Sequence, residues 1–403
     1  MSDAVIRLFY ITLFFIVRGL AWFSRKRPLR KENVKQILVI ELTKLGDLVS
    51  TLPLFTSLKE SFPHATIAVM VQPNHEGLLS LVPEISTALS SPLSQHLWSI
   101  LQSVNLVRRG KFDLVISASP SVRHGILVLL SGAKYKFGYL EFSRAKVVHL
   151  QPHRIRSVGF RMPQEVSRPP SNLAERPSQL CEALGIRPPD ARPSLGFLRK
   201  SSIDGAEAIR TLGLGDGVSF IVVHPFAGWS YRTWAIENFE QLIHRILDSH
   251  ADWLFVIGGD HDRSRLKFLV ERFSEERRVR FCIGLPLNEL AEVIARARLF
   301  IGADSGPLHV ATAVGTPSIG LFGPAPPEIT GPLASVNSYL YKKVECSPCD
   351  QVDCVRKWSP CMSLISVDEV FDKVNQFCLS RSKRSSGRAA LLSNSLQHDR
   401  LPG

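Results

Sequence analysis

Short apolar runs recur along the chain and alternate with longer segments in which apolar residues return about every three to four positions. Short runs of this kind are typical of buried strands, and the longer spacing is typical of amphipathic helices. The pattern predicts strands over Gln36–Glu41, Thr66–Val71, Phe112–Ser117, Ser219–His224, Trp253–Gly258, Leu299–Ala303 and Ser318–Leu321. It predicts helices over Leu48–Phe62, Leu173–Leu184, Ile236–Asp248, Leu287–Ala297, Leu308–Val314 and Val367–Phe377.

The alternation of strand and helix occurs in two series, separated by a Pro- and Arg-rich stretch that ends at Arg187–Pro193. Because single cores rarely grow beyond roughly 250–300 residues, a chain of 403 residues predicts two domains, residues 35–193 and residues 194–379. We therefore expect an α/β fold of two Rossmann-like, doubly wound domains that face each other across a cleft. Ligands in such folds bind at the carboxyl ends of the strands. The Ser- and Arg-rich tail, residues 380–403, is expected to be disordered.

The residues before the first strand, 1–34, form a separate segment. Ala4–Phe23 are almost wholly apolar and aromatic, and a basic cluster follows at residues 25–31. This order of the two parts disfavours a removed signal peptide. The uninterrupted apolar core, Leu8–Val17, is short for a transmembrane span of about 20 residues. We favour a helix lying in the membrane interface over a tilted span, with the basic cluster near anionic lipids on the cytoplasmic side.

The net charge of +13 fits an anionic partner such as a phosphorylated substrate, nucleic acid or a membrane surface. No nucleic-acid motif accompanies the charge, so a nucleic-acid partner is not expected. A G-x-G-x-x-G after the first strand, a Walker loop and an HExxH motif are all absent from the sequence, which argues against dinucleotide oxidoreductases, P-loop enzymes and zinc proteases of that kind.

Four of the seven cysteines fall in one window, at Cys346, Cys349, Cys354 and Cys361. Without a secretory signal, disulfides are not the default. The second pair lacks the close spacing of zinc sites, so reduced structural thiols are favoured over a four-thiolate zinc site.

The segment from Asp304 to His309 has the pattern of a strand end, a tight turn and a helix start. Ser305 suits an N-cap, Pro307 suits the first helical turn, and Gly306 permits close approach to the backbone. A helix start offers free N–H groups and a positive dipole end, which bind diphosphates well. Asp304 and His309 flank this place as polar groups that can orient a ligand. The alternative is a well-capped helix without a ligand.

Polar side chains also follow other predicted strands. Asp47 is either the N-cap of the helix after it or a carboxylate that can take a proton from a hydroxyl. Lys44 can pair with Asp47 or meet an acidic substrate. Arg232 can form a bidentate pair with phosphate oxygens, whereas Trp234 is expected to be a packing anchor. The acidic turn that ends at Asp262 either binds ribose hydroxyls or caps a helix.

Taken together, three segments resemble those of glycosyltransferase family 9, the bacterial heptosyltransferases of lipopolysaccharide core assembly, and the resemblance runs over about residues 35–377. The segments are Leu45-Gly46-Asp47 followed by Thr51-Leu52-Pro53, His224-Pro225 through Arg232-Thr233-Trp234, and Asp304-Ser305-Gly306-Pro307-Leu308-His309 through Phe322-Gly323-Pro324. The cysteine window also resembles that of some members. The resemblance implies a GT-B fold and an inverting transfer from a nucleotide-diphospho-sugar, usually ADP-heptose, with no metal and no cofactor.

The resemblance also implies roles for individual residues. Asp47 would be the catalytic base that deprotonates the acceptor hydroxyl, with Lys44 on the acceptor side. The residues assigned to the donor are Arg232, Asp262, Asp304, Ser305, Gly306, Pro307, Leu308 and His309. Asp262 would hold the ribose, and Asp304 with the following backbone would hold the sugar and pyrophosphate. Arg232 stands where the family commonly has lysine, which keeps the charge but changes the geometry.

In this interpretation residues 35–193 form the acceptor domain and residues 194–379 the donor domain. The acceptor is a lipid-linked saccharide, and the protein works at the cytoplasmic face of the inner membrane, either peripherally or anchored through residues 4–23. One alternative is a transferase of the same family that uses another nucleotide-sugar for a different surface glycan. The other is a non-catalytic protein that binds a nucleotide-sugar.

Overall fold

The computed structural model describes Thr12 and residues 28–91, 97–119, 121–140, 160–161, 172–189, 210, 215, 217–332, 337–349, 354–358 and 360–378. Over these residues no helix has the length and apolar character needed to cross a bilayer. The predicted apolar helix at residues 4–23, apart from Thr12, and the predicted tail at residues 380–403 lie outside the described residues. The predicted domain boundary near residue 193 lies outside them too.

The N-terminal half is built on a six-stranded sheet in the order β3-β2-β1-β4-β5-β6. Its strands are β1 (Gln36–Ile40), β2 (Thr66–Val71), β3 (Thr87–Ser90), β4 (Leu114–Ser117), β5 (Tyr135–Leu140) and β6 (Phe160–Arg161). Neighbours pair in parallel, except that β6 runs antiparallel to β5. The helices are η1 (Lys31–Asn33), α2 (Leu45–Ser61), η2 (Pro73–His75), α3 (Glu76–Leu79), α4 (Leu97–Arg109), α5 (Val122–Leu130), η3 (Leu173–Glu175) and α7 (Arg176–Leu184).

The C-terminal half repeats this plan with a second six-stranded sheet, in the order β12-β11-β10-β7-β8-β9 and parallel throughout. Counted from β7, this is the 3-2-1-4-5-6 order of Rossmann sheets. The strands are β7 (Phe220–His224), β8 (Trp253–Gly258), β9 (Val279–Ile283), β10 (Leu299–Ala303), β11 (Ser318–Phe322) and β12 (Asn337–Tyr341). The helices are η5 (Ser230–Arg232), α9 (Ile236–Ser249), η6 (Asp260–Asp262), α10 (Arg263–Arg272), α11 (Leu287–Arg296), α12 (Gly306–Ala313), α13 (Pro327–Thr330) and η7 (Cys361–Leu364), and residues 367–378 are also helical.

The central strands read as apolar runs because helices cover both faces of each sheet, so β4, β7, β10 and β11 are buried along their whole length. Trp234 confirms its predicted role as a packing anchor. Its indole is wholly buried, meets the ring of Phe239 edge to face at 5.0 Å between centroids, and donates from Nε1 to Ile365 O at 2.9 Å. This bond fixes the start of α9 against the segment that leads into the last helix.

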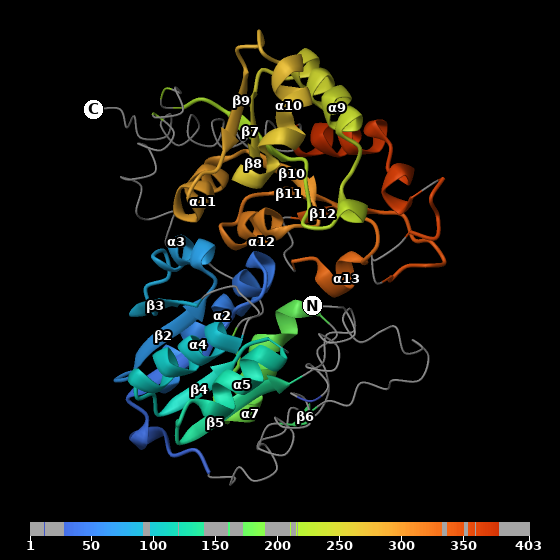
Figure 1. The fold of residues 1–403 in the computed structure, drawn as a ribbon. Helices are drawn as coiled ribbons and strands as arrows, with labels where there is room; N and C mark the ends of the chain where they lie inside the picture. The colour runs from blue at the N-terminus through green and yellow to red at the C-terminus, as the bar shows by residue number, and fades with distance from the viewer. Residues whose placement is uncertain are drawn as a thin grey trace, which may run out of the picture.

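The two halves meet through helices (Figure 1). Helix α12 packs against α2, and α11 packs against α3. A Cβ atom on Gly306 would lie 2.7 Å from Leu45 Cβ, and one on Gly46 would lie 3.0 Å from His309 Cδ2. Glycine on each side therefore allows the first turns of α2 and α12 to touch. A further link joins Asn172 Nδ2 to Glu328 O at 2.6 Å, from the start of η3 to α13.

Two predicted helix boundaries are wrong in the same way. Helix α2 begins at Leu45 and not at Leu48, so Lys44 occupies the N-cap position and Asp47 lies inside the first turn. The predicted N-cap role of Asp47 is therefore incorrect. Helix α12 likewise begins at Gly306, two residues before the predicted run at Leu308 but in agreement with the predicted N-cap at Ser305. In both places a glycine lies within the first turn of the helix, where the other half of the protein packs closely.

Candidate active site

Asp47 is held by an arginine from a distant part of the chain. Arg176 Nη1, at the start of α7, donates to Asp47 Oδ1 at 2.7 Å, and the two side chains are 16% and 19% exposed. Helix α7 packs on α2, which brings these two first turns together. The negative charge of Asp47 also suits the positive end of α2. Arg176 was not predicted from the sequence, because nothing in the pattern links it to a residue 129 positions away.

Beneath this pair lies a wholly buried carboxylate, Glu41, directly after β1. Its Oε1 accepts hydrogen bonds from the backbone N–H of Thr43, at 3.0 Å, and from the Thr43 hydroxyl. Its Oε2 accepts from the hydroxyl of Ser119, which in turn accepts from Arg176 Nη1 at 3.0 Å. Burial, reinforced by the charge of Asp47, raises the pKa of Glu41 to about 7. The available sequence signal was a charged residue that ends an otherwise apolar strand.

Two buried histidines, His124 and His75, lie in the N-terminal half, as Glu41 does. His124 accepts from the Leu42 N–H through Nε2 at 3.1 Å, so its Nδ1–H faces Ser119 O at 3.0 Å. Burial lowers the pKa of His124 to about 4, which keeps the imidazole neutral. His75, at the end of η2, is also buried, and its Nδ1 has no hydrogen-bond partner among the described residues. Burial lowers the pKa of His75, and the charge of Asp47 opposes this effect.

On the C-terminal side, two predicted donor residues pair with each other. Arg232 Nη1 donates to Asp304 Oδ2 at 2.7 Å, and the Thr330 hydroxyl donates to the same oxygen at 3.0 Å. Asp304 is only 5% exposed. His309 lies beside this pair in α12, with its ring over Gly46. Burial lowers the pKa of His309, while the charges of the two carboxylates on either side, Asp304 and Asp47, oppose the shift.

The turn before α12 has the predicted form but different contacts. Ser305 is the N-cap residue and Pro307 lies in the first turn, as predicted. The Ser305 hydroxyl does not cap the helix, however, and hydrogen-bonds His224 Nδ1 at 3.0 Å. The Leu308 side chain is wholly buried in the core, and its N–H donates to Ser305 O at 3.2 Å. The close approach at Gly306 is to the protein's own Leu45.

Lys44 reaches across the contact between the two halves. Its ammonium lies 4.7 Å from the ring centroid of Trp229, so it interacts with a residue of the C-terminal half. Partial burial lowers the pKa of Lys44, and the positive charge of Arg232 adds to this effect. Asp47 is paired with Arg176, and its charge acts on Lys44 without an ion pair between the two side chains among the described residues. The predicted contact of Lys44 with an acidic substrate stays a prediction. Lys44, Asp47, Arg232, Asp304 and His309 nonetheless form one electrostatic cluster.

A cavity of about 240 Å³ opens at the carboxyl ends of β7 and β8. Its lining is mainly apolar and includes Asp262 and the turn residues Ser305, Gly306 and Pro307, with Leu45 as the one lining residue from the described part of the N-terminal half. Asp262 is 3% exposed and accepts from the Gly259 N–H and from Arg265 Nη1, each at 3.0 Å. Asp262 therefore both stabilises its turn and borders the cavity.

Comparison with known proteins shows to which family the chain belongs. The family model described as "Glycosyltransferase family 9 (heptosyltransferase)" matches residues 100–358. The chain belongs to glycosyltransferase family 9. It is an enzyme of the glycosyltransferase class, related to enzymes of lipopolysaccharide core biosynthesis.

Individual members of the family agree with this assignment. The chain is 26% identical to lipopolysaccharide heptosyltransferase 3 from Escherichia coli over 290 residues, covering 69% of this chain and 80% of the relative. The solved structure of E. coli ADP-heptose lps heptosyltransferase II is similar, with a TM-score of 0.66 at 19% identity and 86% and 99% of the two chains covered. A family 9 glycosyltransferase from Veillonella parvula gives a TM-score of 0.67 at 20% identity, covering 88% and 100%. These likenesses show the predicted α/β fold with parallel sheets, matching GT-B heptosyltransferases.

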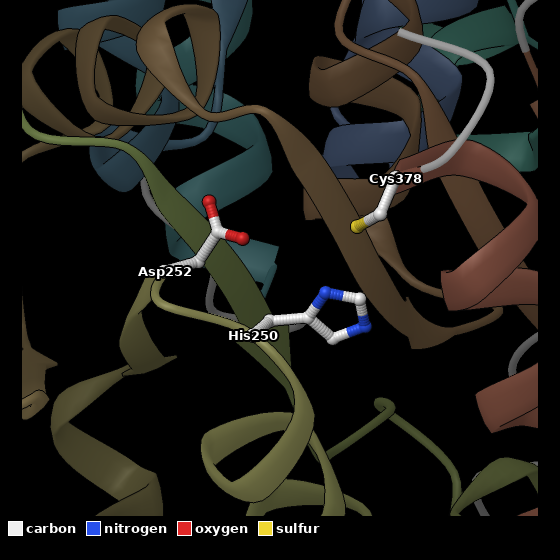
Figure 2. A group of neighbouring side chains, drawn as sticks. All are labelled: His250, Asp252 and Cys378. Atoms are coloured by element: carbon white, nitrogen blue, oxygen red, sulfur yellow. The ribbon is translucent and has the colours of Figure 1, made fainter. Parts of the chain in front are cut away.

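The family 9 chain carries one group of potential metal ligands among the described residues, His250, Asp252 and Cys378, whose ligand atoms lie within 4.8 Å of one another. Figure 2 shows them gathered where the start of β8 meets the end of the last helix. Asp252 Oδ2 already accepts from Arg298 Nη1 at 2.9 Å, and its Oδ1 accepts from Ser219. A fixed guanidinium beside the carboxylate disfavours a cation, and burial raises the pKa of the Cys378 thiol. The group fits a structural network better than a metal site.

The four cysteines of the predicted window are free thiols that line a second cavity, of about 310 Å³. They are not among the described ligand groups whose atoms lie within 4.8 Å of one another. Burial raises the pKa of Cys361, and its three neighbouring cysteines add to the effect. The structure therefore brings the four thiols of the window together around one cavity.

Proposed function

We propose that this enzyme transfers heptose from ADP-heptose to a lipid-linked saccharide acceptor in lipopolysaccharide core biosynthesis, with inversion and without a metal ion. One observation carries the proposal. The contact between the first turns of α2 and α12 puts Asp47 and the Asp304–His309 turn into a single cluster of charges. A carboxylate suited to proton transfer then lies opposite a helix start suited to a diphosphate.

The donor side supports a nucleoside diphosphate. The cavity of about 240 Å³ is mainly apolar, as a nucleobase requires, and has the Asp262 carboxylate at its edge. The start of α12 borders the same cavity through Ser305 and Gly306. The name of the structurally similar E. coli enzyme, ADP-heptose lps heptosyltransferase II, supports ADP-heptose as the donor.

The proposed reaction is a single displacement. The acceptor oxygen attacks the anomeric carbon, the bond from that carbon to the diphosphate oxygen breaks, and the hydroxyl proton passes to Asp47. Since Oδ1 of Asp47 accepts from Arg176, we assign Oδ2 as the oxygen that takes the proton. Arg232 and the N–H groups at the start of α12 stabilise the charge that develops on the leaving ADP. Closure of the two halves brings donor and acceptor together.

We also propose that residues 1–34 hold the enzyme at the cytoplasmic face of the inner membrane, where a lipid-linked acceptor is presented. The support is the apolar run at Ala4–Phe23 and the basic cluster after it. Removal of residues 1–34 should release the protein from the membrane fraction while its ADP binding is retained. Unchanged fractionation of the shortened protein would contradict this part of the proposal.

The test of the function is a donor screen with purified protein, in which ADP-sugars and UDP-sugars are offered with a heptose-deficient lipopolysaccharide acceptor. We expect ADP-heptose to be turned over. Asp47→Asn should lower kcat by about 10²–10⁴-fold, the range for loss of a general base. Asp113→Asn is the matched control, because this aspartate binds the backbone of Lys35 and Gln36 at the opposite end of the same sheet. Normal transfer by Asp47→Asn would rule out Asp47 as the base, and turnover of a UDP-sugar alone would reassign the donor.

A further inference from the structure

A chain of contacts leads from Asp47 to a buried carboxylate that the proposed reaction does not use. Arg176 Nη1 donates both to Asp47 Oδ1, at 2.7 Å, and to Ser119 Oγ, at 3.0 Å. The Ser119 hydroxyl donates to Glu41 Oε2. Glu41 comes from the end of β1 and Ser119 from the segment after β4, so the carboxyl ends of two adjacent strands form the floor of this site.

The burial of Glu41 needs an explanation. A wholly buried carboxylate is costly unless hydrogen bonds or an opposite charge compensate it. Glu41 accepts hydrogen bonds from Thr43, from Ser119 and, at 3.4 Å, from Thr51, and the Ser119 hydroxyl connects it to the guanidinium of Arg176. Through Ser119, this costly buried carboxylate is well placed to influence Arg176 and, beyond it, Asp47.

We propose that Glu41 is a positioning residue for the reaction, which holds Arg176 in place through Ser119 and, when ionised, favours proton transfer to Asp47. The inference rests on the proposed function in one respect, that Asp47 takes the proton of the acceptor hydroxyl. Glu41 itself forms and breaks no bond with the substrate. The proton moves only from the acceptor oxygen to Asp47.

The first effect, the positioning of Arg176, depends on the direction in which the Ser119 hydroxyl donates its hydrogen. A hydroxyl has one hydrogen to donate, and an ionised carboxylate can only accept. When Glu41 is ionised, the Ser119 hydrogen must point to Glu41, which leaves the Ser119 oxygen as the acceptor for Arg176. When Glu41 is protonated, its own hydroxyl can donate to Ser119, and the orientation of the chain is no longer fixed.

The second effect, the easier proton transfer to Asp47, comes from the negative charge of ionised Glu41. The negative charge of ionised Glu41 repels that of Asp47, and this repulsion is relieved when Asp47 takes up a proton. The ionised form therefore makes Asp47 a better proton acceptor. Glu41 titrates at about pH 7, so this effect begins within the range in which an assay can be run.

The other charged groups around this network do not reproduce that behaviour. The guanidinium of Arg176, from α7, is one of these groups. His124, from α5, packs against Leu42 and Ser119, and burial holds its pKa at about 4, so it remains neutral. Burial also lowers the pKa of His75, from η2. Burial lowers the pKa of His309, from α12, as well, and the charge of Asp47 opposes that shift. A rise in rate near pH 7 is therefore assigned to Glu41 when it is lost in Glu41→Gln.

The test compares the pH dependence of kcat for the full-length protein and for Glu41→Gln, with ADP-heptose and a lipopolysaccharide acceptor. We expect kcat of the wild type to rise on the order of tenfold as Glu41 ionises, and kcat of Glu41→Gln to stay at the low-pH level. The KM for the donor should not change, because Glu41 does not line the donor cavity. Ser119→Ala should lower kcat in the same way with an unchanged donor KM, and it provides a second variant should Glu41→Gln fold poorly.

Asp252→Asn is the matched control. Asp252 is also buried and also bound to a serine and an arginine, Ser219 and Arg298, but it lies at the amino end of β8. It should keep the pH profile of the wild type. A rise near pH 7 that persists in Glu41→Gln would overturn the inference, as would an equal loss at every pH. Full activity of Asp47→Asn would instead refute the proposed base, so the two failures can be told apart.

Discussion

Replacing Glu41 by glutamine should change how the stability of the protein depends on pH. Burial, reinforced by the charge of Asp47, raises the pKa of Glu41 from 4.5 to about 7 in the folded state. Between these values the folded protein binds more protons than the unfolded chain. The stability contributed by Glu41 is therefore fully present below about pH 4.5 and is lost as the pH rises through about 7. Relative to Glu41→Gln, the wild type should lose stability over this interval.

The size of the effect follows from the same two values. Each pH unit between them is worth about 1.4 kcal/mol for one proton, which gives a total of about 3 kcal/mol. Glu41 is wholly buried, so solvent screening does not reduce this figure. Buried histidines act with the opposite sign, because burial lowers the pKa of His124 and His224 from 6.5 to about 4. Their contribution is lost as the pH falls, but it is common to both proteins and cancels in the difference.

The assay is urea denaturation followed by tryptophan fluorescence at about pH 5 and about pH 8. The free energy of unfolding of Glu41→Gln minus that of the wild type should increase by about 2.5 kcal/mol between the two pH values, because a small part of the loss has already occurred at about pH 5. Val115→Ala is a suitable control, because Val115 is wholly buried in the adjacent strand β4 and has no titratable group. It should lower stability equally at both pH values. A difference between Glu41→Gln and the wild type that does not vary with pH would refute the reasoning.

Three further changes test the rest of the site and the packing beside it. Arg232→Ala leaves the buried Asp304 without its 2.7 Å partner, so it should destabilise the protein by ~3 kcal/mol and weaken ADP binding, with partial recovery in Arg232→Lys. Equal ADP affinities of Arg232→Ala and the wild type, measured by calorimetry, would contradict this role. Gly306→Ala places a methyl group 2.7 Å from Leu45 Cβ, so it should lower kcat and enlarge the radius of gyration, and the added change Leu45→Gly, which removes that Cβ, should reverse both. A single variant with wild-type kcat and size would argue against a tight contact. Trp234→Phe removes the bond to Ile365 O and should lower the free energy of unfolding by about 1–3 kcal/mol in urea denaturation, whereas unchanged stability would show that this carbonyl finds another donor.

The sequence predicted the parts of the fold that are apolar and central. β2 and β8 have the bounds expected from their apolar runs, and the first strand differs from β1 by one residue. The edge strands β3 and β12 were missed because their residues are only partly buried, so no apolar run marks them. The strand β9 was missed for a related reason, since Arg280 interrupts it.

The site was predicted on one side more completely than on the other. The pairing of Arg232 with Asp304 joins two segments that the sequence had already singled out. Arg176 and Glu41 were missed because their importance arises from tertiary contacts. Arg176 reaches Asp47 only because α7 packs on α2, and Glu41 becomes notable only when its burial is known. Sequence patterns indicate where strands end, but they do not show which distant side chain fills the space behind a carboxylate.

One hydrogen bond joins the helix that carries Arg176 to the other half of the protein. Asn172 binds Glu328 O and also caps η3, which runs directly into α7. Separation of the two halves would break this bond, which lies next to the first turn of α7, where Arg176 holds Asp47. The Asn172 amide thus connects the separation of the two halves to the hydrogen bond by which Arg176 holds Asp47. Through it, the chemistry at Asp47 can respond to the position of a domain that Asp47 does not belong to.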